Sequence, residues 1–80
     1  MKITNQVAVE LEIGGTILAP GQSQDFHEAT FNRLSVHSES GSVEITTEYS
    51  QRSFEAFGKL KVREGESRNE YGMKEVIIFS

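Results

Sequence analysis

The chain has 80 residues, no cysteine and a net charge of −4 at pH 7. At this length folding buries roughly 60% of the surface of the unfolded chain, so the core is small and association with other molecules would add stability. The lack of cysteine excludes disulfides and thiolate metal sites, and the acidic balance argues against nucleic-acid binding, which favours a basic surface.

Short strands separated by turn residues are predicted along most of the chain. Apolar and polar residues alternate over residues 6–13, which predicts the clearest strand. Gly14-Gly15 then indicates a tight hairpin turn, and Pro20-Gly21 indicates a type II turn. The predicted strands cover residues 2–4, 6–13, 16–19, 23–27, 31–38, 43–48, 59–63 and 74–80.

The pattern is less regular after Tyr49. Residues 53–58 fit one helical turn between Ser53 and Gly58, and they also fit a strand or an aromatic loop. Residues 64–72 are polar and contain two glycines, so we expect a mobile loop there. Four successive apolar residues at 76–79 need burial on both faces, either as a central strand or as an edge strand covered by another molecule.

Strand starts recur about every ten residues, which indicates an all-β fold. We expect a single domain over residues 1–80, built as a small antiparallel β-sandwich of the immunoglobulin-like kind or as a partly open barrel, with one short helical turn near residues 53–58. The N-terminus lacks the apolar run of a signal peptide, and residues 76–79 are too few to span a bilayer. We therefore expect no membrane partner and no secretion by a signal peptide.

Groups suited to catalysis are sparse. Asp25 and His27 are two residues apart, on one face of a predicted strand, and with Glu28 they could orient a base or bind a metal ion. Their spacing matches no established motif. We predict that the chain is not an enzyme and uses no cofactor or metal, and a metal-dependent or hydrolytic enzyme built on these three residues is the alternative from that class.

Charge is distributed unevenly along the chain. Residues 1–50 carry two cations and seven acids, a net charge of −5, whereas residues 51–80 carry six cations and five acids, a net charge of +1. Such polarity is typical of two solvated faces of one domain, or of a surface that orients a partner or a second copy. Lys59, Lys61 and Arg63 form a basic stripe, with Arg52 and Lys74 expected beside it. With Phe54, Phe57 and Tyr71 as stacking platforms, this stripe also permits an alternative function, single-stranded nucleic-acid binding by a β-barrel.

The aromatic and basic stretch after residue 48 is the predicted contact surface, because aromatic side chains and arginine are enriched at interface hot spots. The two phenylalanines of this stretch could equally complete the core. The predicted partner-binding residues are Tyr49, Arg52, Phe54, Phe57, Lys59, Lys61 and Arg63.

The stretch NQVAVELEIGGTILAPGQSQDF resembles a segment of small all-β accessory proteins of tailed bacteriophages. In those proteins a strand, a glycine turn, a short strand and an L-x-P-G-Q/E-S turn open an immunoglobulin-like or related sandwich. The resemblance covers about a quarter of the chain and does not extend past Ser53. It implies a virion or host-interaction protein, located in the virion or in the host cytoplasm, and it assigns no functional residue.

The sequence thus predicts a protein-binding module without catalysis. Its most specific form is a small phage structural protein, such as a capsid decoration or cement protein, which acts as a homo-oligomer on a larger assembly. The alternative is a phage-encoded inhibitor of a host defence complex, similar to an anti-CRISPR protein, which would have the same size, acidity and lack of catalytic groups.

Overall fold

The computed structural model describes residues 1–27, 31–49 and 51–80, and this part of the chain contains strands and no helix. The fold is therefore all-β, as the sequence predicts. The strands are β1 (Lys2–Asn5), β2 (Leu11–Ile13), β3 (Thr16–Leu18), β4 (Ser23–Asp25), β5 (Phe31–Ser38), β6 (Gly41–Glu48), β7 (Gln51–Gly58), β8 (Lys61–Arg68) and β9 (Lys74–Phe79).

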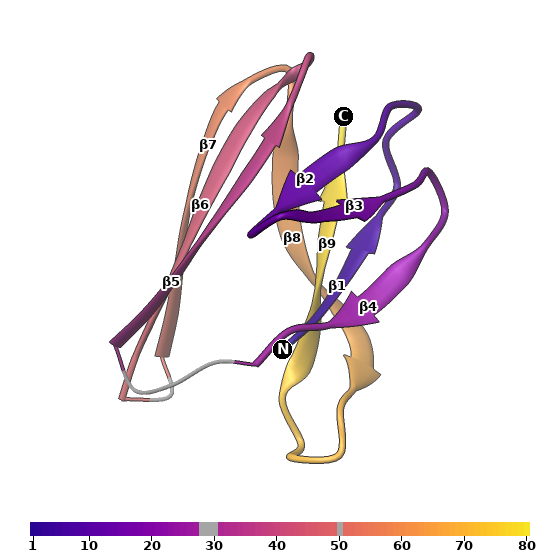
Figure 1. The fold of residues 1–80 in the computed structure, drawn as a ribbon. Helices are drawn as coiled ribbons and strands as arrows, with labels where there is room; N and C mark the ends of the chain where they lie inside the picture. Colours follow the sequence, from indigo (N-terminus) through magenta and orange to yellow (C-terminus); the bar gives the residue numbers. More distant parts are fainter. Residues whose placement is uncertain (28–30, 50) are drawn as a thin grey trace.

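The strands form two sheets that pack as a β-sandwich (Figure 1). The first sheet has the order β4-β1-β9-β8, and the second has the order β3-β2-β5-β6-β7. Neighbouring strands are antiparallel except for β1 and β9, which pair in parallel from Ile3 opposite Val76 to Asn5 opposite Ile78. Both sheets are open, so the sandwich form is confirmed and the chain does not close into a barrel.

The chain crosses from the first sheet to the second immediately after β1, and a buried asparagine holds this crossing. The Asn5 side chain donates to the carbonyls of Val9 and Leu18, both at 2.9 Å, and accepts from the amide of Val7 at 2.8 Å. The predicted strand over residues 6–13 is therefore wrong before Leu11. Its apolar alternation arises because Val7 is buried and Val9 is half-buried as the chain passes between the sheets.

The two predicted turns are confirmed. Gly14 and Gly15 both have positive φ, at 56° and 84°, as a type I′ turn between β2 and β3 requires. Gly21 has a φ of 83°, and the amide of Gln22 donates to the carbonyl of Ala19 at 3.0 Å, as in a type II turn. These turns place β2 and β3 in the second sheet and return the chain to the first sheet at β4.

Two expectations for the second half of the chain are wrong. Residues 51–58 form strand β7 in register with β6, so there is no helical turn at 53–58, and the alternative of a strand holds instead, with Phe54 and Phe57 on opposite faces. The loop expected at 64–72 is a strand as far as Arg68, because a β-bulge between Glu64 and Arg68 accommodates its polar, glycine-containing sequence.

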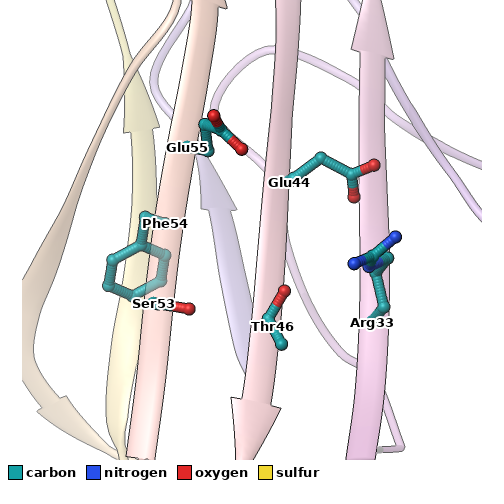
Figure 2. A pocket seen from close by; sticks show the side chains of 6 residues that line it. All are labelled: Arg33, Glu44, Thr46, Ser53, Phe54 and Glu55. Atoms are coloured by element: carbon teal, nitrogen blue, oxygen red, sulfur yellow. The ribbon is translucent and has the colours of Figure 1, made fainter.

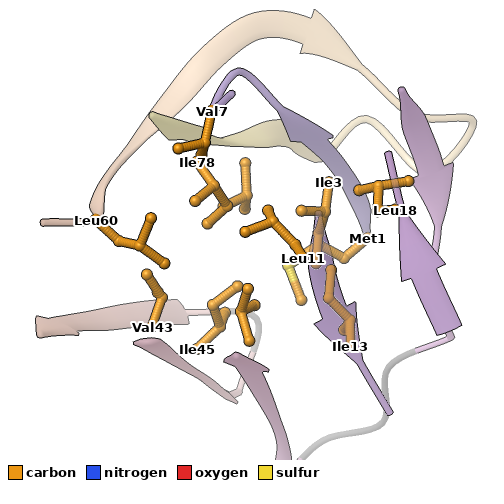
Figure 3. Packing of buried hydrophobic residues seen from close by; sticks show 12 residues of the cluster. Met1, Ile3, Val7, Leu11, Ile13, Leu18, Val43, Ile45, Leu60 and Ile78 are labelled. Carbon is orange, nitrogen blue, oxygen red and sulfur yellow. The ribbon is translucent and has the colours of Figure 1, made fainter. Parts of the chain in front are cut away.

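The core lies between the sheets and consists of aliphatic side chains from both (Figure 3). The interpretation of residues 76–79 as a central strand is confirmed, because β9 lies between β1 and β8. Val76 and Ile78 belong to the core, whereas Ile77 is only 5% exposed on the opposite face of the sheet. Gly65 leaves room for Ile77, since a Cβ there would lie 2.8 Å from the Ile77 Cδ1 atom.

Candidate functional site

The edge of the second sheet at β7 is open along its full length. β7 pairs with β6 through eight consecutive residues, from Gln51 opposite Glu48 to Gly58 opposite Gly41. In the described part of the chain no strand pairs with its other side. Such an edge offers unpaired backbone N–H and C=O groups to a further strand.

The register identifies which backbone groups face outward. The amide of Lys59 donates to the carbonyl of Ser40 at 2.8 Å, one position beyond the pair Gly41–Gly58. Antiparallel pairing alternates hydrogen-bonded and non-hydrogen-bonded positions, so the odd-numbered residues of β7 face β6. The backbone groups of Phe54 and Ala56 therefore face the open edge.

The other three sheet edges are shorter or protected. β3 and β4 have only three residues each. β8 has eight residues, but it carries Lys61 and Arg63 and contains the bulge after Glu64, and cations and bulges both discourage the addition of a strand. β7 carries one cation, Arg52, near its start, where the side chain contacts the backbone of Lys74. It has no proline and no register shift, so it is the sheet edge best suited to pair with another chain.

Two phenylalanines flank this open edge on opposite faces. Phe54 lies opposite Ile45, points into the sandwich and packs against the core. Phe57 lies opposite Ser42 on the outer face, where its side chain remains 49% exposed. The edge therefore combines free backbone groups with an exposed aromatic side chain.

A cationic groove of about 310 Å³ lies between β7 and the β8–β9 hairpin. Arg52 reaches across it from β7 and donates a hydrogen bond from Nη1 to the backbone carbonyl of Lys74. Arg68 lies directly opposite Lys74 in the hairpin, and its Nη1 donates to the carbonyl of Gly72 at 2.6 Å. The lining residues are Arg52, Glu64, Arg68, Gly72, Met73 and Lys74.

The outer face of the second sheet beside β7 has the opposite charge. Glu44 of β6 and Glu55 of β7 are cross-strand partners, and both line a shallow cavity of about 400 Å³ together with Arg33 (Figure 2). The Ser35 hydroxyl lies 2.9 Å from the Glu44 Oε2 atom, to which it donates a hydrogen bond. β7 therefore separates an acidic outer face from a cationic groove.

The structure distributes the seven predicted contact residues over two surfaces. Tyr49 lies in the β6–β7 turn and Phe57 near the far end of β7, and eight residues of extended chain span roughly 26 Å. Lys61 and Arg63 belong to the first sheet, where the Arg63 guanidinium carbon lies 5.7 Å from the centre of the Phe79 ring. Arg52, Phe54 and Phe57 remain together on β7, and Lys59 follows this strand.

Sequence reasoning placed Lys74 with Arg52 beside a basic stripe but missed the contribution of Arg68. Arg68 lies within the stretch expected to be a loop, and nothing in its spacing indicates that it faces Arg52. The signal available in the sequence was the excess of cations after residue 50. The structure gathers three of those cations into one groove.

The residues of the alternative functions are only partly brought together. Asp25, at the end of β4, and His27 are exposed and line one small cavity of about 160 Å³, which Tyr71 also lines, and Glu28 lies outside the described residues. Within residues 1–27, 31–49 and 51–80, no group of three metal-ligating side chains comes together. Phe54 and Phe57 belong to the second sheet, whereas Tyr71 projects from the β8–β9 turn with 79% exposure.

Comparisons with protein-family models, with curated proteins and with solved structures found no match to this chain. The described segments include no helix long and apolar enough to cross a membrane.

Proposed function

We propose that this chain is a non-catalytic protein-binding module that takes an extended segment of a partner protein onto the open edge of β7. The observation that carries the proposal is the unprotected eight-residue edge with Phe57 exposed beside it. Strand addition is a common mode of peptide recognition, in which backbone hydrogen bonds supply affinity and alternate side chains supply specificity.

The energetics fit this mode of binding. Each backbone hydrogen bond formed at the edge contributes about 0.5–1.5 kcal/mol, so several bonds together offset the ordering of a short extended segment. Burial of the exposed Phe57 ring adds an apolar contribution of about 2 kcal/mol. Pairing with a second copy of the chain along the same edge would form a homo-oligomer.

The test uses a proline at an edge-facing position. Ala56→Pro removes an N–H that faces the open edge and leaves the β6–β7 hydrogen bonds in place, whereas Ala56→Thr keeps that N–H and serves as the matched control. A partner captured from a lysate of the source cells by the native chain and by Ala56→Thr, but not by Ala56→Pro, supports the proposal. Equal capture by all three proteins contradicts it.

The more specific proposal, a small phage structural protein such as a capsid decoration protein, is supported by the resemblance of residues 5–26 to accessory proteins of tailed bacteriophages. An inhibitor of a host defence complex is the competing form of the same binding function. Measuring the amount of this chain in purified phage particles distinguishes the decoration protein from the inhibitor. A decoration protein is present in many copies per particle, whereas an inhibitor is absent from the particle.

A further inference from the structure

We infer that the segment bound at the β7 edge is acidic, with its carboxylates on the alternate positions that face the groove between β7 and the β8–β9 hairpin. This inference rests on the proposed function. It deepens that function by specifying the chemistry of the partner.

The first argument is the charge of the groove. Three of its six lining residues are cations, Arg52, Arg68 and Lys74, and Glu64 is its one carboxylate. The groove thus has a formal charge of +2 in a chain whose net charge is −4. An opposite charge on the ligand strengthens binding and accelerates association with such a surface.

The second argument is the arrangement of the cations. Arg68 and Lys74 are direct cross-strand partners, and like charges in that position destabilise a sheet. Arg52 adds a third cation, because its guanidinium reaches the backbone carbonyl of Lys74. A carboxylate in the groove would relieve this repulsion, so the arrangement favours an anionic occupant over an apolar or cationic one.

The third argument is the position of the groove beside the open edge. Arg52 and Phe54 share the inward face of β7, opposite Thr47 and Ile45. A strand added to β7 places every second side chain on this inward face and the others on the outer face, beside Glu55. Of the inward-facing residues of β7, Arg52 lines the groove, so acidic residues are expected at the inward-facing positions beside Arg52, with uncharged or basic residues at the outward-facing positions.

The test compares two synthetic peptides of ten residues with capped ends, one alternating threonine with glutamate and the other alternating threonine with glutamine. Fluorescence anisotropy with the full chain should show at least about tenfold tighter binding of the glutamate peptide at low salt, and high salt should remove the difference. Ala56→Pro should abolish the binding of both peptides.

Charge variants locate the interaction. Arg68→Gln with Lys74→Gln should weaken binding of the glutamate peptide about tenfold and leave the glutamine peptide unchanged. Lys2→Gln with Arg33→Gln alters the net charge equally, outside both the groove and the predicted contact residues, and should change neither affinity by more than about twofold. Equal effects of the two double variants would contradict a site in the groove.

The remaining outcomes separate this inference from the proposed function. Equal binding of both peptides, with loss in Ala56→Pro, overturns the acidic specificity and leaves strand addition intact. Binding that persists in Ala56→Pro overturns both, because the attraction is then independent of the edge. If light scattering shows a dimer that does not bind the glutamate peptide, a second copy of the chain occupies the β7 edge, and the inference of an acidic partner segment is overturned.

Discussion

Arg52 of β7 donates a hydrogen bond to the backbone carbonyl of Lys74 at the start of β9, and this contact joins the open edge of one sheet to the central strand of the other. The same side chain also lines the cationic groove. Arg52 therefore has two expected roles, in the stability of the sandwich and in the charge of the proposed binding surface.

Arg52→Ala should lower the free energy of unfolding by about 2 kcal/mol, because hydrogen bonds from charged donors contribute about 1.5–3 kcal/mol. Urea denaturation measures this change. Gln51→Ala, at the exposed neighbouring position, is the control and should stay within about 0.5 kcal/mol of the native chain. Similar values for the two variants would show that the contact between the sheets does not stabilise the fold.

Gly41→Ala should prevent folding or lower stability by about 3 kcal/mol or more. Gly41 and Gly58 are cross-strand partners, and a Cβ on Gly41 would lie 2.2 Å from the backbone oxygen of Phe57. Gly72→Ala is the comparison, since Gly72 also has positive φ but has open space around it, so its cost should be about 1–2 kcal/mol. Thermal unfolding should rank the two variants in this order, and the reverse order would contradict the close approach of β6 and β7.

Asn5→Ala should destabilise the chain by about 3 kcal/mol, because it leaves three backbone groups at the crossing without their side-chain partner. Asn69→Ala provides the contrast. The Asn69 side chain accepts two hydrogen bonds, from the amides of Tyr71 and Met73, but it lies in a more exposed turn. Removal of this side chain should therefore lower the free energy of unfolding by about 1 kcal/mol. Urea denaturation measures both free energies of unfolding. Equal losses for Asn5→Ala and Asn69→Ala would contradict the structural importance of the buried Asn5.

Glu55→Lys should stabilise the chain by about 0.5 kcal/mol, because it replaces a repulsive pair with Glu44 by an attractive one. Since both side chains lie on the outer face, the gain should shrink as salt is added. Glu48→Lys changes the charge equally at a position that does not face Glu55 and serves as the control. A stability gain that is insensitive to salt would point to a cause other than the cross-strand charge pair.

The two glycine turns and the β5–β6 hairpin were predictable because their signals are local. The two turns need φ values that few residues other than glycine and proline adopt. Gly14-Gly15 and Pro20-Gly21 supply these values, so both turns could be assigned from the residues alone. The strand at 31–38 was likewise predicted with the bounds that the structure gives. The central position of residues 76–79 followed from their continuous apolar sequence, which needs burial on both faces.

The crossings and the groove depend on contacts between distant parts of the chain, which the sequence pattern does not encode. Val7 and Val9 alternate like strand residues, yet the side chain of Asn5 holds that segment as a passage between the sheets. Arg52 and Lys74 are separated by 22 positions and meet only because β7 and β9 belong to opposing sheets. For the same reason the candidate site could be predicted at β7 and Lys74 could be placed only beside a basic stripe, whereas the position of Arg68 could not be predicted.

Amide hydrogen exchange by NMR, with and without the captured partner, tests the central claim that β7 is the binding edge. The amides of Phe54 and Ala56 should exchange quickly in the free chain, because they face the open edge, and at least about tenfold more slowly in the complex. Amides on the β8 edge should not change. Protection that appears on β8 or β4 while Phe54 and Ala56 continue to exchange quickly would contradict the account.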